Sequence, residues 1–460
     1  MNKILFAIAL SAALPALCAA QTLTLYPEGG EGRQTSETYS VSVDGRSVWT
    51  EKIGPGGMED LHVANFSCSG THAVSVSVPE EVRTFSVQPR SSGVTASSEG
   101  NRIDFTIPGP GYYYIRINDL PYLAVFADSP QTDVPAPGSR GVTYYGPGTH
   151  EVGTITLKDD MKIYLAPGAL LKARIRGGGK NVKIYGRGSL QGNISANGCE
   201  RLLVEGIFIR SSGGWTNTLS QCTSTTYRDV KVFSHTGTWG LDGINPVTCD
   251  TFLIDHCFIR TRDDCIAIKA YAREGMPFTG CRNITVRRSV MIGWDHADGV
   301  TLGFELNGGV VENVLVTDCD ILRARGSGRT GGHSAFSIVC DGPSDVRNIT
   351  FDNIRVASEI EYKNLEIILT EGERYGNGKM GTIKGVHVSN VSWENGLKPL
   401  TIVGHPKRFV EDVSFTNCYI AGKLLDSVDD ADFQIEYVSG LSINGKPQET
   451  SRWPLSPQGK

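Results

Sequence analysis

The sequence predicts an all-β protein in which a small antiparallel β-sandwich precedes a right-handed parallel β-helix. Two patterns lead to this prediction. The first part of the chain has short runs of alternating apolar and polar residues separated by turn residues, which is typical of an antiparallel sandwich. The C-terminal two-thirds repeats a strand-like segment at an irregular spacing of 20 to 37 residues, which indicates a solenoid of parallel strands.

Each copy of the repeat places apolar residues at positions 0, +2, +5 and +7, as in Leu202, Val204, Ile207 and Ile209. We expect one strand with a kink from each copy. Clear copies begin at Leu202, Phe252, Val314, Ile349, Val386 and Val413, and weaker ones at Val182, Val230 and Ile284. Asn precedes many copies, namely at Asn181, Asn283, Asn313 and Asn348.

A proline-rich stretch from Ser129 to Gly138 marks the boundary between the two parts. We therefore expect a signal peptide at 1–20, a β-sandwich domain at 21–128, a linker at 129–139, a parallel β-helix domain at 140–440 and a C-terminal tail at 441–460. A solenoid grows by repeats, so one long domain of this kind escapes the usual limit on core size.

Residues 1–20 have the features of a secretory signal peptide: Lys3, an apolar run from Ile4 to Leu17, and small residues before Gln21. We expect an exported protein, periplasmic or secreted. A lipid anchor on Cys18 is the less favoured alternative, because Leu17 stands where a small residue is expected. No later stretch is apolar for long enough to span a bilayer.

Charge and cysteine content narrow the possible partners. Lys and Arg number 44 against 49 Asp and Glu, a formal net charge of −5 without any basic block, so we expect no nucleic-acid partner. Export permits disulfides, but Cys257, Cys319 and Cys418 occupy an inward slot of the repeat, where we expect small core residues. The pairing of the other cysteines stays open. We expect a monomer.

Three carboxylates are predicted to meet on neighbouring coils. Asp242 lies 12 residues after the copy start Val230, and Asp264 lies 12 residues after Phe252. Equivalent positions in a parallel β-helix stack about 4.8 Å apart, so the two should be neighbours, with Asp263 beside them. At least one carboxyl should have a raised pKa, because like charges this close cannot all ionise. Such a group keeps an acid and a base together at neutral pH.

The segments IYLAPGALLKA and KNVKIYGRGSLQG, the DGI element at Asp242, and RDDCIAIK, which begins 20 residues later, resemble the polygalacturonase clan of β-helix glycosidases. This clan includes glycoside hydrolase families 28 and 49, and the similarity covers about residues 140–440, which would form the catalytic domain. The resemblance implies that Asp263 is the general acid that protonates the glycosidic oxygen. Asp242 and Asp264 would hold and deprotonate the attacking water, with inversion at the anomeric carbon.

The sequence departs from family 28 at two places that matter for the substrate. Ala297-Asp298-Gly299 stands where that family has Gly-His-Gly, and Ala335-Phe336-Ser337 stands where it has an Arg-Ile-Lys element that engages a uronate carboxylate. We therefore expect a neutral glycan, dextran-like or glucan-like. A polygalacturonase or rhamnogalacturonase acting on pectin is the alternative, with positive charge supplied by Arg262, Lys269, Arg273, Arg329 or His333.

Several further residues are candidates for substrate contact. Aromatic side chains near the active coils could stack on sugar rings or only pack: Trp215, Trp239, Tyr271 and Trp294. His296 and Asp298 are predicted to reach the substrate. Lys269 would be either a subsite residue or a salt-bridge partner of an Asp, and Glu305 would face either the cleft or solvent.

Two other classes of function are alternatives to a hydrolase of poly- or oligosaccharides. A polysaccharide lyase would use the carboxylates to hold Ca²⁺ and an Arg or Lys as base. A non-catalytic glycan-binding protein would gain nothing from three converging carboxylates. We favour the hydrolase, without cofactor or metal. The sandwich would be a carbohydrate-binding module or, as we favour, a lid on the open N-terminal edge of the β-helix.

Overall fold

The computed structural model describes residues 21–450 except 31, 55–59, 211–212, 235–239, 272–274, 277–278, 295, 326–333, 373, 375 and 377. Within these ranges the regular secondary structure consists of strands and two short 3-10 helices, η1 (Arg90–Ser92) and η2 (Val428–Asp430). The predicted signal peptide lies outside the described residues. In the described ranges no helix has the length and apolar character needed to cross a membrane.

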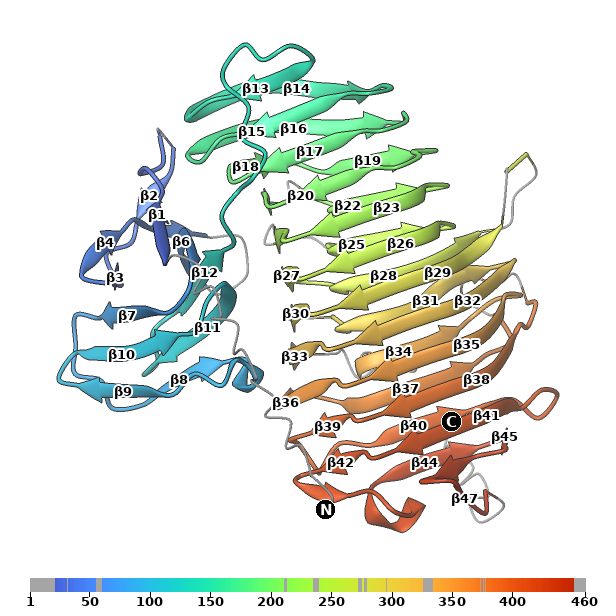
Figure 1. Ribbon diagram of the computed structural model, residues 1–460. Helices are drawn as coiled ribbons and strands as arrows, with labels where there is room; N and C mark the ends of the chain where they lie inside the picture. The colour runs from blue at the N-terminus through green and yellow to red at the C-terminus, as the bar shows by residue number, and fades with distance from the viewer. Residues whose placement is uncertain are drawn as a thin grey trace, which may run out of the picture.

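From Val142 onward the chain forms the predicted parallel β-helix (Figure 1). Each coil contributes one strand to a 14-stranded sheet and further strands to a 21-stranded sheet. Two successive coils show the plan: β26 (Asp250–Asp255), β27 (Phe258–Thr261) and β28 (Ile266–Tyr271) are followed by β29 (Gly280–Arg287), β30 (Val290–Gly293) and β31 (Val300–Asn307). Each strand of the first coil pairs in parallel with its counterpart in the second.

The 14-stranded sheet contains β26, β29 and the following strands: β13 (Val142–Tyr145), β15 (Lys162–Leu165), β17 (Lys183–Gly186), β20 (Leu203–Glu205), β23 (Thr223–Arg228), β32 (Val310–Thr317), β35 (Asp345–Asp352), β38 (Thr382–Ser389), β41 (Val410–Thr416), β45 (Val438–Ser439), β46 (Ser442–Ile443) and β47 (Lys446–Pro447). Because this sheet continues to Pro447, part of the tail predicted at 441–460 belongs to it.

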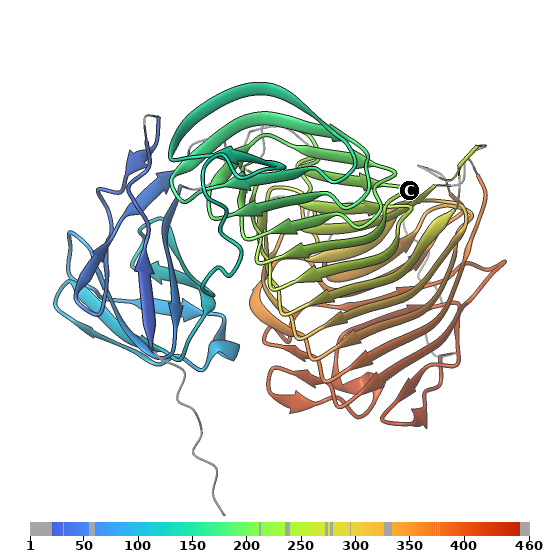
Figure 2. The same ribbon diagram turned by 45° about the horizontal axis from the view of Figure 1, so that its top comes forward.

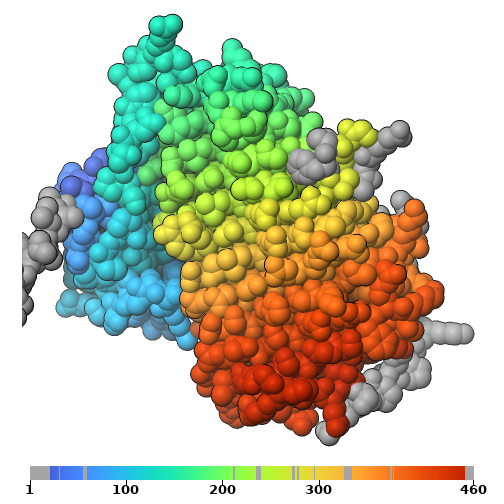
Figure 3. Space-filling view, turned by 45° about the vertical axis from the view of Figure 1, so that its right-hand side comes forward, coloured from blue at the N-terminus to red at the C-terminus, as the bar shows by residue number. Residues whose placement is uncertain are grey.

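The 21-stranded sheet contains β27, β28, β30, β31 and the following strands: β14 (Gly148–Leu157), β16 (Ala169–Gly177), β18 (Ser189–Gln191), β19 (Ile194–Asn197), β21 (Phe208–Arg210), β22 (Asn217–Ser220), β24 (Lys231–Phe233), β25 (Ile244–Val247), β33 (Asp320–Ala324), β34 (Ser334–Cys340), β36 (Arg355–Ile360), β37 (Lys363–Leu369), β39 (Ser392–Trp393), β40 (Leu400–Val403), β42 (Tyr419–Ile420), β43 (Lys423–Leu424) and β44 (Phe433–Glu436). In the space-filling view the colours follow one another along the β-helix, as stacking of successive coils requires (Figure 3).

A left-handed residue in each repeat copy explains the kink. His256, four residues after the copy start Phe252, has φ 53°, and Asp318 in the copy that starts at Val314 has φ 55°. Each copy is therefore two strands in different sheets, such as β26 and β27, rather than one bent strand. The Asn residues before the copies have the same conformation, which Asn tolerates better than most residues. Their amides also form a ladder, with Asn313 Nδ2 donating to Asn283 Oδ1 at 3.0 Å.

One copy start in the sequence prediction is wrong. The weak copy assigned to Val230 begins at Thr225, which pairs with Phe252 in the next coil. Val230 is the +5 position of that copy, and it is buried with the rest of the core. Thr225 is polar, so an apolar pattern alone passes over it.

The stacking of Asp242 and Asp264 was predicted from an equal offset of 12 residues, but the two offsets were counted from positions of the repeat that are not equivalent. Cys257 is the true counterpart of Val230, and Asp264 follows Cys257 by seven residues, so the earlier coil is five residues longer before Asp242. The predicted stacking is nevertheless present, because Ile244 pairs with Ile266 in parallel.

The sandwich consists of a seven-stranded and a five-stranded sheet. The larger contains β1 (Thr22–Leu25), β2 (Gln34–Thr35), β5 (Thr50–Ile53), β6 (Leu61–Ser69), β8 (Phe85–Gln88), β11 (Gly111–Ile117) and β12 (Tyr122–Asp128). The smaller contains β3 (Ser40–Val43), β4 (Arg46–Val48), β7 (His72–Ser77), β9 (Ala96–Glu99) and β10 (Arg102–Ile107). Neighbouring strands are antiparallel except β6 and β12, which run parallel.

The sandwich docks on the side of the β-helix and is not a lid over its N-terminal edge (Figures 1 and 2). Tyr114 and Phe126 from the sandwich pack in one apolar cluster with a row of outward side chains from β21, β24, β27, β30 and β33. These strands belong to five successive coils. The row comprises Phe208, Phe233, Phe258, Val290, Ile292 and Leu322. The apolar outer face of these coils, rather than the sheet edge, is what the sandwich covers.

Buried ion pairs cross the same interface at two carboxylates of the sandwich, Asp128 and Glu51. Lys231 of the β-helix, 0% exposed, binds Asp128 of the sandwich, which also lies 3.4 Å from Arg187. Glu51 of the sandwich accepts two hydrogen bonds from Arg210, at 2.8 and 2.6 Å. Burial opposes ionisation of Glu51, but the charges of its arginine partners lower its pKa to about 2.

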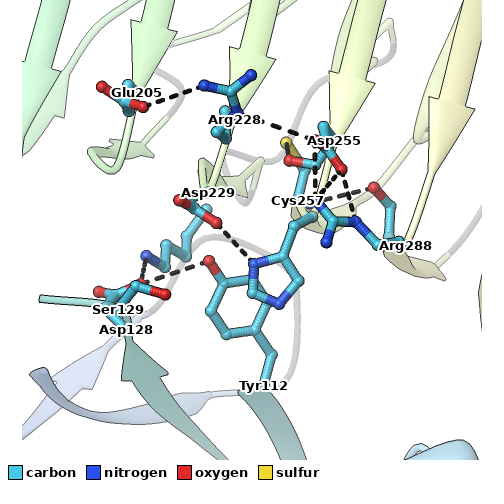
Figure 4. A network of polar contacts seen from close by, with 12 residues as sticks. Tyr112, Asp128, Ser129, Glu205, Arg228, Asp229, Asp255, Cys257 and Arg288 are labelled. Carbon is cyan, nitrogen blue, oxygen red and sulfur yellow. Dashed lines mark hydrogen bonds and ion pairs between the residues drawn. The ribbon is translucent and has the colours of Figure 1, made fainter. Parts of the chain in front are cut away.

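The network continues into the β-helix, where Asp229 lies near Tyr112 and Asp128, and Asp255 lies further away beside Arg228 and Arg288 (Figure 4). The Tyr112 hydroxyl donates to Asp128 Oδ1 at 3.4 Å, and the Tyr112 ring stacks on His256 at 4.3 Å. Polar and apolar contacts thus hold the sandwich against the coils next to the predicted carboxylates.

The ten cysteines of the described chain are all buried as free thiols. Cys257, Cys319 and Cys418 belong to the β-helix core, as the repeat predicts.

Candidate active site

The predicted carboxylates gather where each coil turns into its third strand. Asp242 precedes Ile244 at the start of β25 by two residues, and Asp264 precedes Ile266 at the start of β28 by two residues. Backbone bonds continue the ladder into these turns, since the Gly243 amide donates to the Asp264 carbonyl at 2.8 Å. Carboxylate oxygens of Asp242, Asp263 and Asp264 all lie within 4.8 Å of one another.

Asp242 is the carboxylate with a cation beside it. Its side chain is 3% exposed, accepts a hydrogen bond from Asn245 Nδ2 at 2.8 Å and lies 3.6 Å from Lys269 Nζ. Burial raises the pKa of Asp242, and the Lys269 charge and the Asn245 hydrogen bond oppose that shift. Asp242 is therefore the member of the group that is best supported as an anion.

Asp263 is only partly buried and has no such partner in its described contacts. It accepts hydrogen bonds from the Gly240 amide at 2.9 Å and the Asp264 amide at 3.1 Å. Burial and the neighbouring Asp242 charge raise the pKa of Asp263 to about 7. Asp263 can therefore carry a proton at neutral pH and can also give it up there.

Asp264 lies deeper, between Asp242 and the next coil. It is 4% exposed, and its Oδ1 accepts a hydrogen bond from the Asp298 amide at 2.9 Å. Burial and the charges of Asp298 and Asp263 raise the pKa of Asp264 well above its usual value. One water molecule can bond to two oxygens up to about 5.5 Å apart, so Asp242 and Asp264 are close enough to share one.

Residues 180–405 match the model of glycosyl hydrolases family 28. The chain is a family 28-like glycoside hydrolase. The match includes all three carboxylates and the coils on either side of them. Among curated proteins, none matches the sequence.

Solved structures share the fold of this hydrolase at low sequence identity. Dex49A from Penicillium minioluteum is 14% identical with a TM-score of 0.61, over 91% of this chain and 96% of that one. A hyperthermoactive exopolygalacturonase from Thermotoga maritima is 19% identical with a TM-score of 0.53, over 66% of this chain and 84% of that one. A family 28 exopolygalacturonase from Yersinia enterocolitica is 12% identical with a TM-score of 0.51, over 84% of this chain and 98% of that one.

The substrate contact predicted for Asp298 disagrees with its position in the hydrolase. Asp298 is 0% exposed, and its carboxylate accepts hydrogen bonds from the Ser337 hydroxyl and the Ser334 amide. Burial raises its pKa to about 6, although the Ser337 bond lowers it. Ala335 and Ser337 are also 0% exposed. The Asp298 amide supports Asp264, and the three buried residues do not form a surface for a sugar.

The other predicted substrate contacts lie in different places. Trp294 packs against the interface cluster with Arg323 3.7 Å above its ring, which is a packing environment, and its role in binding stays a prediction. Tyr271 ends β28 and is partly buried, and the His296 amide donates to the Arg262 carbonyl at 3.1 Å, close to Asp263. Trp239 lies outside the described residues.

Lys269 is a salt-bridge partner, one of the two alternatives that the sequence left open. It is 3% exposed, bonds to Glu305 Oε2 at 2.5 Å and lies 4.5 Å from the Trp215 ring. Burial lowers the pKa of Lys269, but the charges of Asp242 and Glu305 outweigh it and raise the pKa overall. A lysine held in this way is a poor base.

Sequence reasoning missed Asn245 and left Glu305 undecided. Asn245 follows Asp242 by three residues, and a parallel coil turns its side chain outward next to that carboxylate. The alternation of β25 would have shown this once Ile244 was recognised as inward. Glu305 depends on a register shift that no local pattern reveals.

Proposed function

We propose that this protein is an exported hydrolase that cleaves a neutral glycan with inversion, with Asp263 as general acid and Asp242 as general base. The observation that carries the proposal is the unequal environment of the carboxylates. Asp242 has Lys269 at 3.6 Å, whereas Asp263 faces the Asp242 charge and has a pKa raised to about 7. Two carboxyls whose surroundings separate their pKa values are the usual basis of acid and base assignments.

In the reaction that we propose, Asp263 gives its proton to the glycosidic oxygen as the bond to the anomeric carbon breaks. Asp242 takes a proton from the attacking water, and Asp264 holds that water from the second side. Transition-state charge on the sugar ring favours anionic Asp242 nearby. Carboxylate oxygens of the three residues lie within 4.8 Å, shorter than the roughly 6.5–9.5 Å common in inverting enzymes and nearer the roughly 5–5.5 Å of retaining ones. Inversion therefore requires that Asp242 and Asp264 hold the water between them and that neither attacks the sugar.

A neutral sugar fits the charges of the described residues around the site. The acidic side chains are Asp242, Asp263, Asp264, Asp298 and Glu305. The two lysines that act on them are already paired, Lys269 with Glu305 and Asp242, and Lys363 with Glu366. Arg262, directly before Asp263, is the remaining described cation among those that the sequence offered for binding a uronate. Arg273, Arg329 and His333 lie outside the described residues.

A divalent-cation-dependent lyase is the second candidate, because three carboxylate oxygens within 4.8 Å could also surround a cation. β-Elimination needs a base that loses its proton near neutral pH. Lys269 does not meet this need, because its pKa is raised by its two carboxylate partners. Loss of activity in chelator, with an unsaturated product that absorbs in the ultraviolet, would favour the lyase.

A single screen tests the proposal. The purified protein is incubated with dextran, pullulan, polygalacturonate and rhamnogalacturonan, with and without chelator, and new reducing ends are measured. Proton NMR of the first products on the active polymer gives their anomeric configuration. We expect chelator-resistant release of reducing ends with inverted configuration. Retained configuration would make one Asp a nucleophile and overturn the assigned mechanism.

We also expect a preference for neutral over uronic-acid oligosaccharides of the same length. One uncompensated like-charge contact near 4 Å costs up to about 4 kcal/mol at an effective dielectric constant near 20, so the ratio of kcat/KM should favour the neutral oligosaccharide by up to about 10³-fold. Competition between the two oligosaccharides in one assay measures it. If the uronate is preferred and Arg262→Ala abolishes that preference, Arg262 binds the carboxylate and the pectin alternative is correct.

A further inference from the structure

An insertion in one coil places a carboxylate beside the lysine of the site. Ile268 pairs with Leu302 and Ala270 pairs with Leu306, so Gly303, Phe304 and Glu305 stand opposite Lys269 alone. A bulge of this kind redirects a side chain that regular pairing would place elsewhere.

Gly303 makes the insertion possible. Its φ is +133°, and a Cβ at this position would lie 2.4 Å from the Val339 carbonyl oxygen of the next coil. Only glycine fits that approach. The bulge then carries Glu305 to Lys269, where its Oε2 accepts a hydrogen bond at 2.5 Å.

We infer that Glu305 and Lys269 are positioning residues that hold Asp242 as the anionic base of the hydrolase, an inference that rests on the proposed function. Glu305 fixes the Lys269 ammonium at a point 3.6 Å from Asp242 Oδ2. The Trp215 ring, 4.5 Å from the same nitrogen, excludes water from one side of it. A buried charge pair interacts more strongly than an exposed one, so Lys269 has a large effect on which carboxyl ionises.

The two residues have opposite effects on Asp242. Lys269 favours its ionised form, and the negative charge of Glu305 disfavours it. Glu305 is nevertheless needed for position, because without it the flexible lysine side chain has a single anchor. The charged and polar groups that face Asp242 from the surrounding strands and turns are Asn245, Asp263, Asp264, Lys269 and Glu305, with Asp298 acting through Asp264.

The opposite effects of Lys269 and Glu305 on Asp242 provide a test, because a Lys269–Glu305 pair with a structural role alone would not shift the titration of Asp242 in opposite directions. Lys269→Met should move the titration of Asp242 upward by about 1–3 pH units, as expected for losing an opposite charge at this distance. The acidic limb of kcat/KM should follow, lowering activity at pH values below it by at least about tenfold. Glu305→Gln should move the same limb to lower pH, because it removes a negative charge near Asp242 while the Gln side-chain oxygen can still accept the hydrogen bond from Lys269.

Two readouts separate this inference from the proposed function. The ¹³Cγ resonance of Asp242, assigned by its loss in Asp242→Asn, reports the titration without any substrate. The pH dependence of kcat/KM is measured on the polymer that the screen identifies. If Asp242→Asn and Asp263→Asn keep full activity, the proposed function fails, whereas the carboxyl titration still decides the inference about Lys269 and Glu305.

Controls for folding and for nonspecific charge effects are available in the chain. Glu312→Gln removes a carboxylate that binds Arg282 at 3.1 Å and Arg347 at 2.8 Å on the other sheet, and it should leave both limbs unchanged. If Lys269→Met fails to fold, the double variant Lys269→Met/Glu305→Leu removes both charges together. The inference is overturned if folded Lys269→Met and Glu305→Gln shift Asp242 in the same direction or not at all.

Discussion

Asp263→Asn is expected to lower kcat/KM on an unactivated glycan by about 10²–10⁴-fold, the usual effect of removing a general acid. Asn has nearly the same shape, and it can still accept the hydrogen bond from the Gly240 amide that Asp263 accepts at 2.9 Å. The fold should therefore persist, which circular dichroism and thermal unfolding can verify. What the variant lacks is the proton for the leaving oxygen.

Two observations would support this explanation for the loss. An aryl glycoside with a good leaving group needs little protonation, so Asp263→Asn should retain much more activity on it than on the polymer. In the wild type, activity should fall as the pH rises through about 7, where Asp263 loses its proton. Near-normal turnover of the unactivated glycan by Asp263→Asn would show that another group is the acid.

Asp128→Asn is expected to destabilise the protein by about 3–5 kcal/mol, because it leaves buried cations without their counter-charge. Lys231 is 0% exposed and Arg187 lies 3.4 Å from the same carboxylate. Lys231→Met should cost much less, since Asp128 keeps Arg187 as a partner. Differential scanning calorimetry of the two variants measures the difference as a change in Tm.

A matched control shows whether burial causes the effect. Lys384 binds Glu411 at 3.3 Å on the exposed surface, and Lys384→Met should change the stability by no more than about 1 kcal/mol. Equal stability of Asp128→Asn and the wild type would mean that the interface rests on its apolar contacts alone.

The fold was predictable because every coil needs apolar side chains at the same inward positions, and these appear in the sequence as a repeat. The 0, +2, +5, +7 pattern, as in Phe252, Ile254, Cys257 and Ile259, follows directly from two short strands that share one core. The left-handed residue between them was visible only as a kink. Thr225 shows the limit of the method: a polar residue at a core position hid a copy start, and the offset to Asp242 was miscounted.

The site was predictable to the extent that it depends on register. Asp242, Asp263 and Asp264 meet because parallel pairing repeats the same turn in successive coils. Contacts made between coils by side chains far apart in the sequence were not predictable. Glu305 reaches Lys269 through an insertion, and Asp298 is covered by Ser334 and Ser337 of the next coil, which lie 36 and 39 residues further along the chain.

The position of the sandwich determines the order in which the coils of the β-helix should unfold. In a solenoid each coil is stabilised by its two neighbours, so unfolding can begin at an end and proceed one coil at a time. Here the sandwich packs across five successive coils, and opening any one of them requires separation from the aromatic residues of the sandwich. These central coils should therefore unfold together and last. The coils that bear Asp242, Asp263 and Asp264 lie within this block, so the terminal coils could fray without disturbing the geometry of these three aspartates.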